Sequence, residues 1–422
     1  MGFCASELTP FRSEPAKRKL AWALLSNRHP RKTGLAMRVQ MRQFAMLTLL
    51  VCGVAHPSHA QGQEGGPTTP VRPWSVALGG HQSYESGRVL APGTDGGLIS
   101  RGLTAQIGRN WQLRRGAIDV DGNANQLLYD GGQPDQLMYG VSGVGSYSIT
   151  RRFTWQGSSS MSNSYARDSS VLTESGIILQ GNGAMTKTYI SSTSGTYALS
   201  PRSTFTGSVS HTKVSFDSDS ELTSGASLMT RVAFDRELTR TQSLTVSFGN
   251  TFSSGLTGDI QGLLAIWHKK VGQGLTLSLG GGVRPYTLYG ETGKRIAPGL
   301  QMGLEGRLTS TQTLSLTYER AVEQTFGFDR THLAHRVNAN YELVVGRRFQ
   351  VSHTMSYGLN TYPQIANYTL GGWTYSVSSR YLLAANLALT GSYGYWLTQE
   401  TGVASLSSFR TVVGLSYGFG WR

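Results

Sequence analysis

The chain has 422 residues, of which 15% are charged and 39% are hydrophobic, and its formal net charge is +14. So low a charged fraction is unusual for a soluble domain, and no apolar run long enough for a membrane-spanning helix follows the N-terminal region. Residues 61–422 keep 29 of the 38 basic and 22 of the 24 acidic side chains, so half of the basic excess lies before them. Without a clustered basic stripe, the charge gives no reason to expect nucleic-acid binding.

Residues 37–60 have the pattern of a secretory signal peptide. Arg38 and Arg42 form a basic start, a short apolar segment follows, and small residues end the stretch. This order predicts cleavage between Ala60 and Gln61.

The segments on either side of the signal are polar. Residues 1–36 do not suit a position ahead of a signal peptide, and we interpret them as a doubtful N-terminal extension, with translation starting at Met37 or Met41. The alternative is a genuine disordered extension. Residues 61–72, rich in Gly and Pro, are expected to form a flexible lead-in to a single domain over residues 73–422.

Cysteine is confined to the region before the predicted cleavage site. The chain has two cysteines, Cys4 and Cys52, so the mature part would carry none. An absence of thiols suits a protein that matures in an oxidising compartment.

Alternation dominates the chain after Trp74. Apolar residues occupy every second position, and Ser, Thr, Gly, Asn and Gln fill the positions between them, which is the pattern of strands with one apolar face. With no helical pattern to cover either face, the arrangement favours a closed barrel with its apolar face toward lipid and its polar face inward. Clear examples are Leu244, Val246 and Phe248, then Leu275, Leu277 and Leu279, and finally Val413, Leu415, Tyr417, Phe419 and Trp421.

Short polar turns recur between these strands. Eight turns separate nine hairpins, which predicts an all-β, up-and-down antiparallel transmembrane β-barrel of about 18 strands, with 16 as the alternative. Arg gathers in the short turns, whereas acids gather in the longer connections, for which we expect Asp119, Asp121, Asp130, Asp135, Asp217, Asp219, Glu221, Glu323 and Asp329. The turns are centred on Arg109, Arg151, Pro201, Arg240, Gly272, Ser310, Gly346 and Ala384.

Together, the signal peptide, the cysteine-free mature chain, the hairpin rhythm and the aromatic final strand resemble the bacterial outer-membrane porin-type barrels. The resemblance implies an outer-membrane location and an assembly signal at Tyr417, Phe419 and Trp421 that the barrel-assembly machinery would read. It also leaves a homotrimer open, because porins of this type are often trimers. The family usually ends on an aromatic residue, whereas here Arg422 follows Trp421.

Strand parity assigns several charged side chains to the inner face. They could form a charged pore wall that sorts solutes by sign, with a weak anion preference, or they could be salt bridges that stabilise the wall. A register slip of one residue would reverse any assignment. These pore-lining candidates are Arg231, Arg284, Arg307, Arg336, Arg380, Arg410, Glu305, Glu319 and Glu342, with Asp235 and Glu237 on the same parity.

Catalytic and metal-binding patterns are weak. We expect several of the strand histidines to lie on the lipid-facing parity or near strand ends, where catalysis is difficult. The Gly-x-Ser-x-Gly match at residues 414–418 lies inside an alternating strand and lacks the strand-to-helix turn of a nucleophile elbow. Residues 217–221 are acidic but lack the spacing of a calcium loop. We therefore expect no enzyme activity, no cofactor and no metal. The histidines are His211, His268, His335 and His353.

The function that these features favour is a channel that passes small hydrophilic solutes across the outer membrane, in contact with its lipid. Residues 160–186 are the candidate constriction loop. Two alternatives stay open: an export conduit for a secreted polysaccharide or other polymer, and a structural or adhesion barrel with a closed lumen.

Overall fold

The structure, a computed structural model, describes most of the chain from Trp74 onward. The segments at residues 1–36, 37–60 and 61–72, including the predicted Ala60–Gln61 cleavage site, lie outside the described residues. So does the acidic run at residues 217–221. The described ranges are 74–87, 97–130, 135–165, 172–173, 176–177, 185–216, 224–254, 257–272, 274–288, 293–325, 330–363, 368–402 and 405–421.

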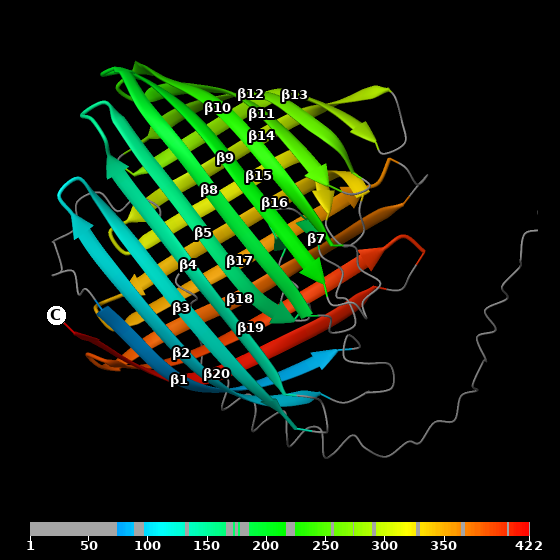
Figure 1. The fold of residues 1–422 in the computed structure, drawn as a ribbon. Helices are drawn as coiled ribbons and strands as arrows, with labels where there is room; N and C mark the ends of the chain where they lie inside the picture. Colours follow the sequence, from blue (N-terminus) through cyan, green and yellow to red (C-terminus); the bar gives the residue numbers. More distant parts are fainter. Residues whose placement is uncertain are drawn as a thin grey trace, which may run out of the picture. The chain divides into compact units, whose positions relative to one another are not determined.

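Eighteen antiparallel strands form one sheet (Figure 1). The first half of the sheet comprises β1 (Trp74–Gly87), β2 (Leu98–Leu113), β3 (Gly116–Tyr129), β4 (Gln136–Ser148), β5 (Phe153–Tyr165), β8 (Met185–Ser200), β9 (Ser203–Phe216), β10 (Gly225–Thr239) and β11 (Gln242–Ser254). The second half comprises β12 (Thr257–Val271), β13 (Leu275–Leu288), β14 (Lys294–Thr309), β15 (Gln312–Thr325), β16 (Arg330–Val345), β17 (Phe349–Thr361), β18 (Thr369–Ala384), β19 (Leu387–Glu400) and β20 (Leu406–Trp421).

The first and last strands close the barrel. β1 pairs with β20 along its whole length, from Trp74 opposite Trp421 to Gly87 opposite Ser408. Closure leaves no sheet edge to lose hydrogen bonds in lipid. The prediction of an 18-stranded antiparallel barrel is therefore confirmed, and the alternative of 16 strands is wrong.

The two faces of the wall differ as the alternation predicts. Along β13, Leu279 and Val283 on one face are 41% and 47% exposed, whereas Ser278 on the other is 8% exposed. Large exposed apolar side chains follow this parity through neighbouring strands, for example Leu263 on β12 and Met302 on β14. Their burial in lipid replaces burial in a core, so this face is the outer one.

Aromatic side chains mark both ends of the outer face. At one end, the guanidinium of Arg109 lies over the rings of Trp74 and Trp111, 4.4 Å from each centroid. At the other, Trp373 and Tyr395 lie with their ring centroids 5.0 Å apart. Amphipathic rings at both membrane–water interfaces are typical of transmembrane barrels. In the part of the chain that the structure describes, no helix is long and apolar enough to span a membrane.

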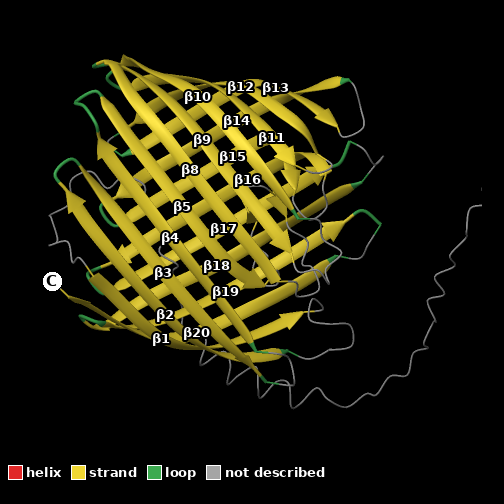
Figure 2. Cartoon of the chain, viewed as in Figure 1, coloured by secondary structure: helices red, strands yellow, loops and turns green. Residues whose placement is uncertain are grey.

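The two ends of the barrel also differ in their connections. One end, here called the turn end, carries the short turns, and it contains Trp74 and Trp421. The opposite end, the loop end, carries most of the longer connections, the longest of which joins β5 to β8. In Figure 2 the turns at the left are short and green, which marks the turn end.

Four residue placements that the sequence predicted in turns and long connections are wrong. Arg109 does not lie in a turn: the first turn is at Arg114 and Arg115, because β2 continues its alternation to Leu113. Asp119 and Asp121 do not lie in a long connection either but within β3, on its inner parity. Glu323 likewise belongs to β15.

A short hairpin lies within the long β5–β8 connection. It consists of β6 (Leu172–Thr173) and β7 (Gly176–Ile177), which pair with one another. β7 approaches β15, β17 and β18, which are far from β5 and β8 in the strand order. β7 therefore lies on the far side of the barrel from β5 and β8, at its label in Figure 1. This hairpin lies within the segment proposed as a constriction loop.

Candidate functional site

All nine pore-lining candidates lie on the face opposite the exposed apolar side chains. Arg231 pairs with Gly249, between the outer-face pairs at Thr230 and Val232, and the others follow the same parity in their own strands. The structure thus places on the inner face Arg231, Arg284, Arg307, Arg336, Arg380, Arg410, Glu305, Glu319 and Glu342.

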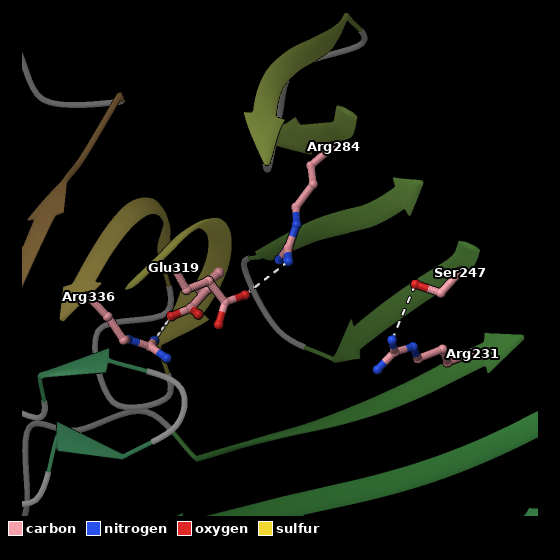
Figure 3. Close-up of polar contacts among 6 residues, drawn as sticks. Arg231, Ser247, Arg284, Glu319 and Arg336 are labelled. Carbon is pink, nitrogen blue, oxygen red and sulfur yellow. Dashed lines mark hydrogen bonds and ion pairs between the residues drawn. The ribbon is translucent and has the colours of Figure 1, made fainter. Parts of the chain in front are cut away.

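Only some of these candidates come together. Arg284 on β13 donates to Glu319 on β15 at 3.0 Å, across the intervening strand β14 (Figure 3). Their side chains are 23% and 39% exposed, so water screens the pair. The Arg284 side chain extends across the wall over two glycines, Gly262 and Gly299, which have no side chains to block it. A Cβ at Gly299 would be 3.4 Å from Arg284 Nε.

Arg336 on β16 forms a second and more buried ion pair. Its partner is Glu323 on β15, and the two side chains are 10% and 14% exposed. His332, fully buried, has its Nε2 3.8 Å from the same carboxylate, and its ring lies tilted against that of Tyr362, with the centroids 5.4 Å apart. Sequence reasoning missed Glu323, because its place near an expected loop assigned it to solvent, and it missed His332, because the register between β15 and β16 was unknown.

The other candidates lie apart from this cluster. Arg231 donates to the Ser247 hydroxyl at 3.2 Å, as Figure 3 shows. Glu342 accepts a hydrogen bond from the Gln350 side-chain amide. The remaining inner-face charges near the turn end are more exposed, namely Glu305, Arg307 and Arg380.

A polar chain on the inner face was also missed. Thr245 donates to the Asp235 carboxylate. His268 links Thr245, at 3.3 Å, to Ser278, at 2.9 Å. His268 thus lies on the inner parity, three residues before the end of β12 at Val271. Ser278 is 8% exposed, so its hydroxyl is poorly placed to attack a substrate.

His335 and His353 lie on the outer face, each held by a tyrosine. Tyr318 Oη is 3.2 Å from His335 Nδ1, and Tyr375 Oη is 3.0 Å from His353 Nδ1. A histidine in lipid needs such a partner because an unsatisfied polar group there is costly. The Gly-x-Ser-x-Gly match lies within β20, with no strand-to-helix turn.

The inner wall divides into two regions of different chemistry. The inner faces of β5, β8 and β9, here called the hydroxyl wall, carry no charged side chain among their described residues. Two hydrogen bonds on it join Ser158 to Ser192 at 2.7 Å and Thr196 to Thr206 at 3.2 Å. The inner faces of β13, β15 and β16, here called the ion-paired wall, hold the Arg284–Glu319 and Arg336–Glu323 pairs.

The inward hairpin connects these two regions. Its chain leaves and rejoins the barrel through β5 and β8, in the hydroxyl wall, and β7 lies against β15 in the ion-paired wall and against β17 and β18 beside it. Figure 3 shows the short strands of the hairpin, in the colour of this part of the chain, below the label of Arg336.

A closed antiparallel barrel with an apolar outer face, aromatic girdles and a polar inner face defines an outer-membrane β-barrel of porin-like architecture, and this chain has that fold. No known protein family matches its sequence, and no curated protein matches it either.

Several solved structures are similar to this chain. OpdK, an outer membrane protein of Pseudomonas aeruginosa, has a TM-score of 0.46 and 12% identity over 82% of this chain and 99% of that chain. OpdQ of the same organism has a TM-score of 0.44 and 11% identity over 82% of this chain and 98% of that one. The siderophore receptor PirA of Acinetobacter baumannii has a TM-score of 0.42 and 9% identity over 83% and 81% of the two chains.

Among the described residues, no group of three or more His, Cys, Asp or Glu side chains is placed to hold a metal ion.

Proposed function

We propose that the protein is an outer-membrane channel that passes small hydrophilic solutes through the barrel. The observation that carries the proposal is the sidedness of the wall: apolar residues face lipid, whereas hydroxyls and paired charges face the enclosed space. Barrels of 16–18 strands are too wide for their own side chains to fill and leave an aqueous channel.

Solutes would pass between two chemically different walls. The hydroxyl wall offers neutral donors and acceptors, and the ion-paired wall offers charges already neutralised by partners. Both walls can replace the water molecules around a polar solute without binding the solute strongly. Weak binding of this kind suits conduction. The inward hairpin reaches across the barrel and would narrow the path, which favours small solutes over an exported polymer.

The other parts of the proposal follow from the fold. The residues Tyr417, Phe419 and Trp421 at the end of β20 would be the signal read by the barrel-assembly machinery, and the rings of Tyr417 and Phe419 lie with their centroids 5.9 Å apart. We propose no enzymatic role and no cofactor. A homotrimer stays a prediction that the single chain does not test.

Liposome swelling tests the proposal. The protein is extracted from outer membranes in detergent, reconstituted into liposomes, and challenged with neutral sugars of increasing size. Swelling that is fast for monosaccharides and slow for larger sugars is the expected result. Liposomes whose folded barrels admit no sugar would contradict the channel and favour a closed structural barrel. Equal rates for large and small sugars would contradict the narrowing by the hairpin.

A further inference from the structure

The outer face of the barrel carries a cluster of basic side chains at the loop end. Lys187 on β8 and His211 and Lys213 on β9 all lie on the lipid-facing parity, and all three are exposed. β8 and β9 are adjacent (Figure 1), and their register sets Tyr189 opposite Lys213 and Ser191 opposite His211. Lys187 and Lys213 are therefore diagonal neighbours on one surface.

The position of the cluster is that of the lipid headgroups. Lys187 follows the first residue of β8 by two positions, and Lys213 precedes the last residue of β9 by three. Tyr189, 40% exposed, lies between them in the aromatic girdle. Below them on the outer face come Val209 and Phe205. Lysine side chains at this level can extend their ammonium groups into the interface while their methylene chains stay in contact with lipid.

Among the described residues of the neighbouring strands, the cluster has no acidic partner on this surface. The outer parity of the described residues of β5, β8, β9 and β10 contains no Asp or Glu, because Asp235 and Glu237 of β10 point inward. Two other cations of the outer face have partners of a different kind: Arg101 pairs with Asp130 at 3.5 Å, and Arg109 lies over two tryptophans. Two neighbouring ammonium groups repel one another and are stabilised by an anion between them.

We propose that Lys187, His211 and Lys213 form a site for the phosphate of an anionic lipid in the leaflet at the loop end of the barrel. The two ammonium groups would bind the phosphate oxygens as point charges. The His211 ring would add a hydrogen-bond donor, and the Tyr189 ring would pack against the lipid below its headgroup. The site faces lipid rather than the enclosed space, so it is independent of the proposed channel.

Native mass spectrometry of the protein in detergent tests the site, with phosphatidylglycerol and phosphatidylcholine of the same acyl chains as probes. Both lipids carry a phosphate, but only phosphatidylglycerol is a net anion. The wild-type protein is expected to retain phosphatidylglycerol in preference to phosphatidylcholine. The variant Lys187→Gln/Lys213→Gln is expected to lose about 25-fold in phosphatidylglycerol affinity, because each basic residue near an anionic surface contributes about fivefold.

Two further variants control for charge and folding. Lys294→Gln removes an exposed, outward lysine at the same end of the barrel, on β14, and should leave retention unchanged. Lys187→Arg/Lys213→Arg should restore retention, and heat-modifiable mobility on a gel shows that each variant folds.

Four outcomes would overturn the site. They are equal retention of the two lipids by the wild type, unchanged retention in Lys187→Gln/Lys213→Gln, an equal loss in Lys294→Gln, and displacement of the lipid by inorganic phosphate at the same concentration. The last would mean that the cluster binds a free anion rather than a lipid.

Discussion

The hydroxyl wall and the ion-paired wall have the same backbone and the same alternation, but they solve the problem of a polar inner face differently. On β5, β8 and β9 the inner face is polar without charge, and hydroxyls bond to one another across strands. On β13, β15 and β16 it is charged, and most of that charge is neutralised by partners on other strands. The first solution needs only the right residue types, whereas the second needs the right register.

Loss of Glu323 should have the largest effect on the free energy of unfolding. It breaks the most buried ion pair of the ion-paired wall, for which the hydroxyl wall has no counterpart among the described residues. Glu323→Gln leaves Arg336, which is 8% exposed, without its carboxylate. Removing one partner of a buried ion pair costs roughly 3 kcal/mol. Tryptophan-fluorescence unfolding in lipid vesicles measures the loss. Glu305→Gln, at an exposed inner-face position on β14, is the control and should change stability by less than about 0.5 kcal/mol. Equal losses in both variants would show that the burial of the pair is unimportant.

Removal of the inward hairpin should have the next largest effect, because the hairpin joins the two walls. Replacing residues 166–184 by a short Gly-Ser turn deletes β6 and β7 while keeping β5 and β8 adjacent. Single-channel conductance should rise several-fold as the path widens. Shortening the loop-end connection at residues 88–97, which joins β1 to β2, is the control and should change conductance little. An unaltered conductance in the hairpin variant would rule out constriction by this segment.

A smaller effect is expected at the exposed ion pair of the ion-paired wall. Arg284→Gln removes a positive charge from the inner face and leaves Glu319 without its partner at 3.0 Å. Reversal potentials in a salt gradient should shift toward cation selectivity, while stability falls by less than about 1 kcal/mol, since the pair is partly exposed. Arg236→Gln, on the outer face of β10, is the matched control and should leave the potential unchanged. A shift toward anions would contradict the placement of Arg284 in the path.

The hydroxyl wall should show the smallest effect. Ser158→Ala removes one side of the Ser158–Ser192 hydrogen bond of 2.7 Å. Because water can replace the lost partner, the free energy of unfolding should fall by about 0.5 kcal/mol or less. A double-mutant cycle with Ser192→Ala measures the coupling. A coupling energy as large as that of the Arg336–Glu323 pair would remove the distinction between the two walls.

The same difference explains how much could be predicted from the sequence. Alternation is a local property, so it was enough to predict the barrel, the strand number and the face on which Arg284 and Glu319 lie. Partners are not local: the Arg336–Glu323 pair and the chain from Asp235 to Ser278 depend on register between strands and on the curvature of the wall. The first turn was misplaced because Arg109 resembles a turn residue in sequence but stacks on tryptophans in the structure.

The central claim is that the space between the two walls conducts, and single-channel recording in a planar bilayer tests it most directly. The expected result is discrete conductance steps that scale with salt concentration, and larger steps once β6 and β7 are removed. A correctly folded barrel that gives no steps, with or without the hairpin, would contradict it.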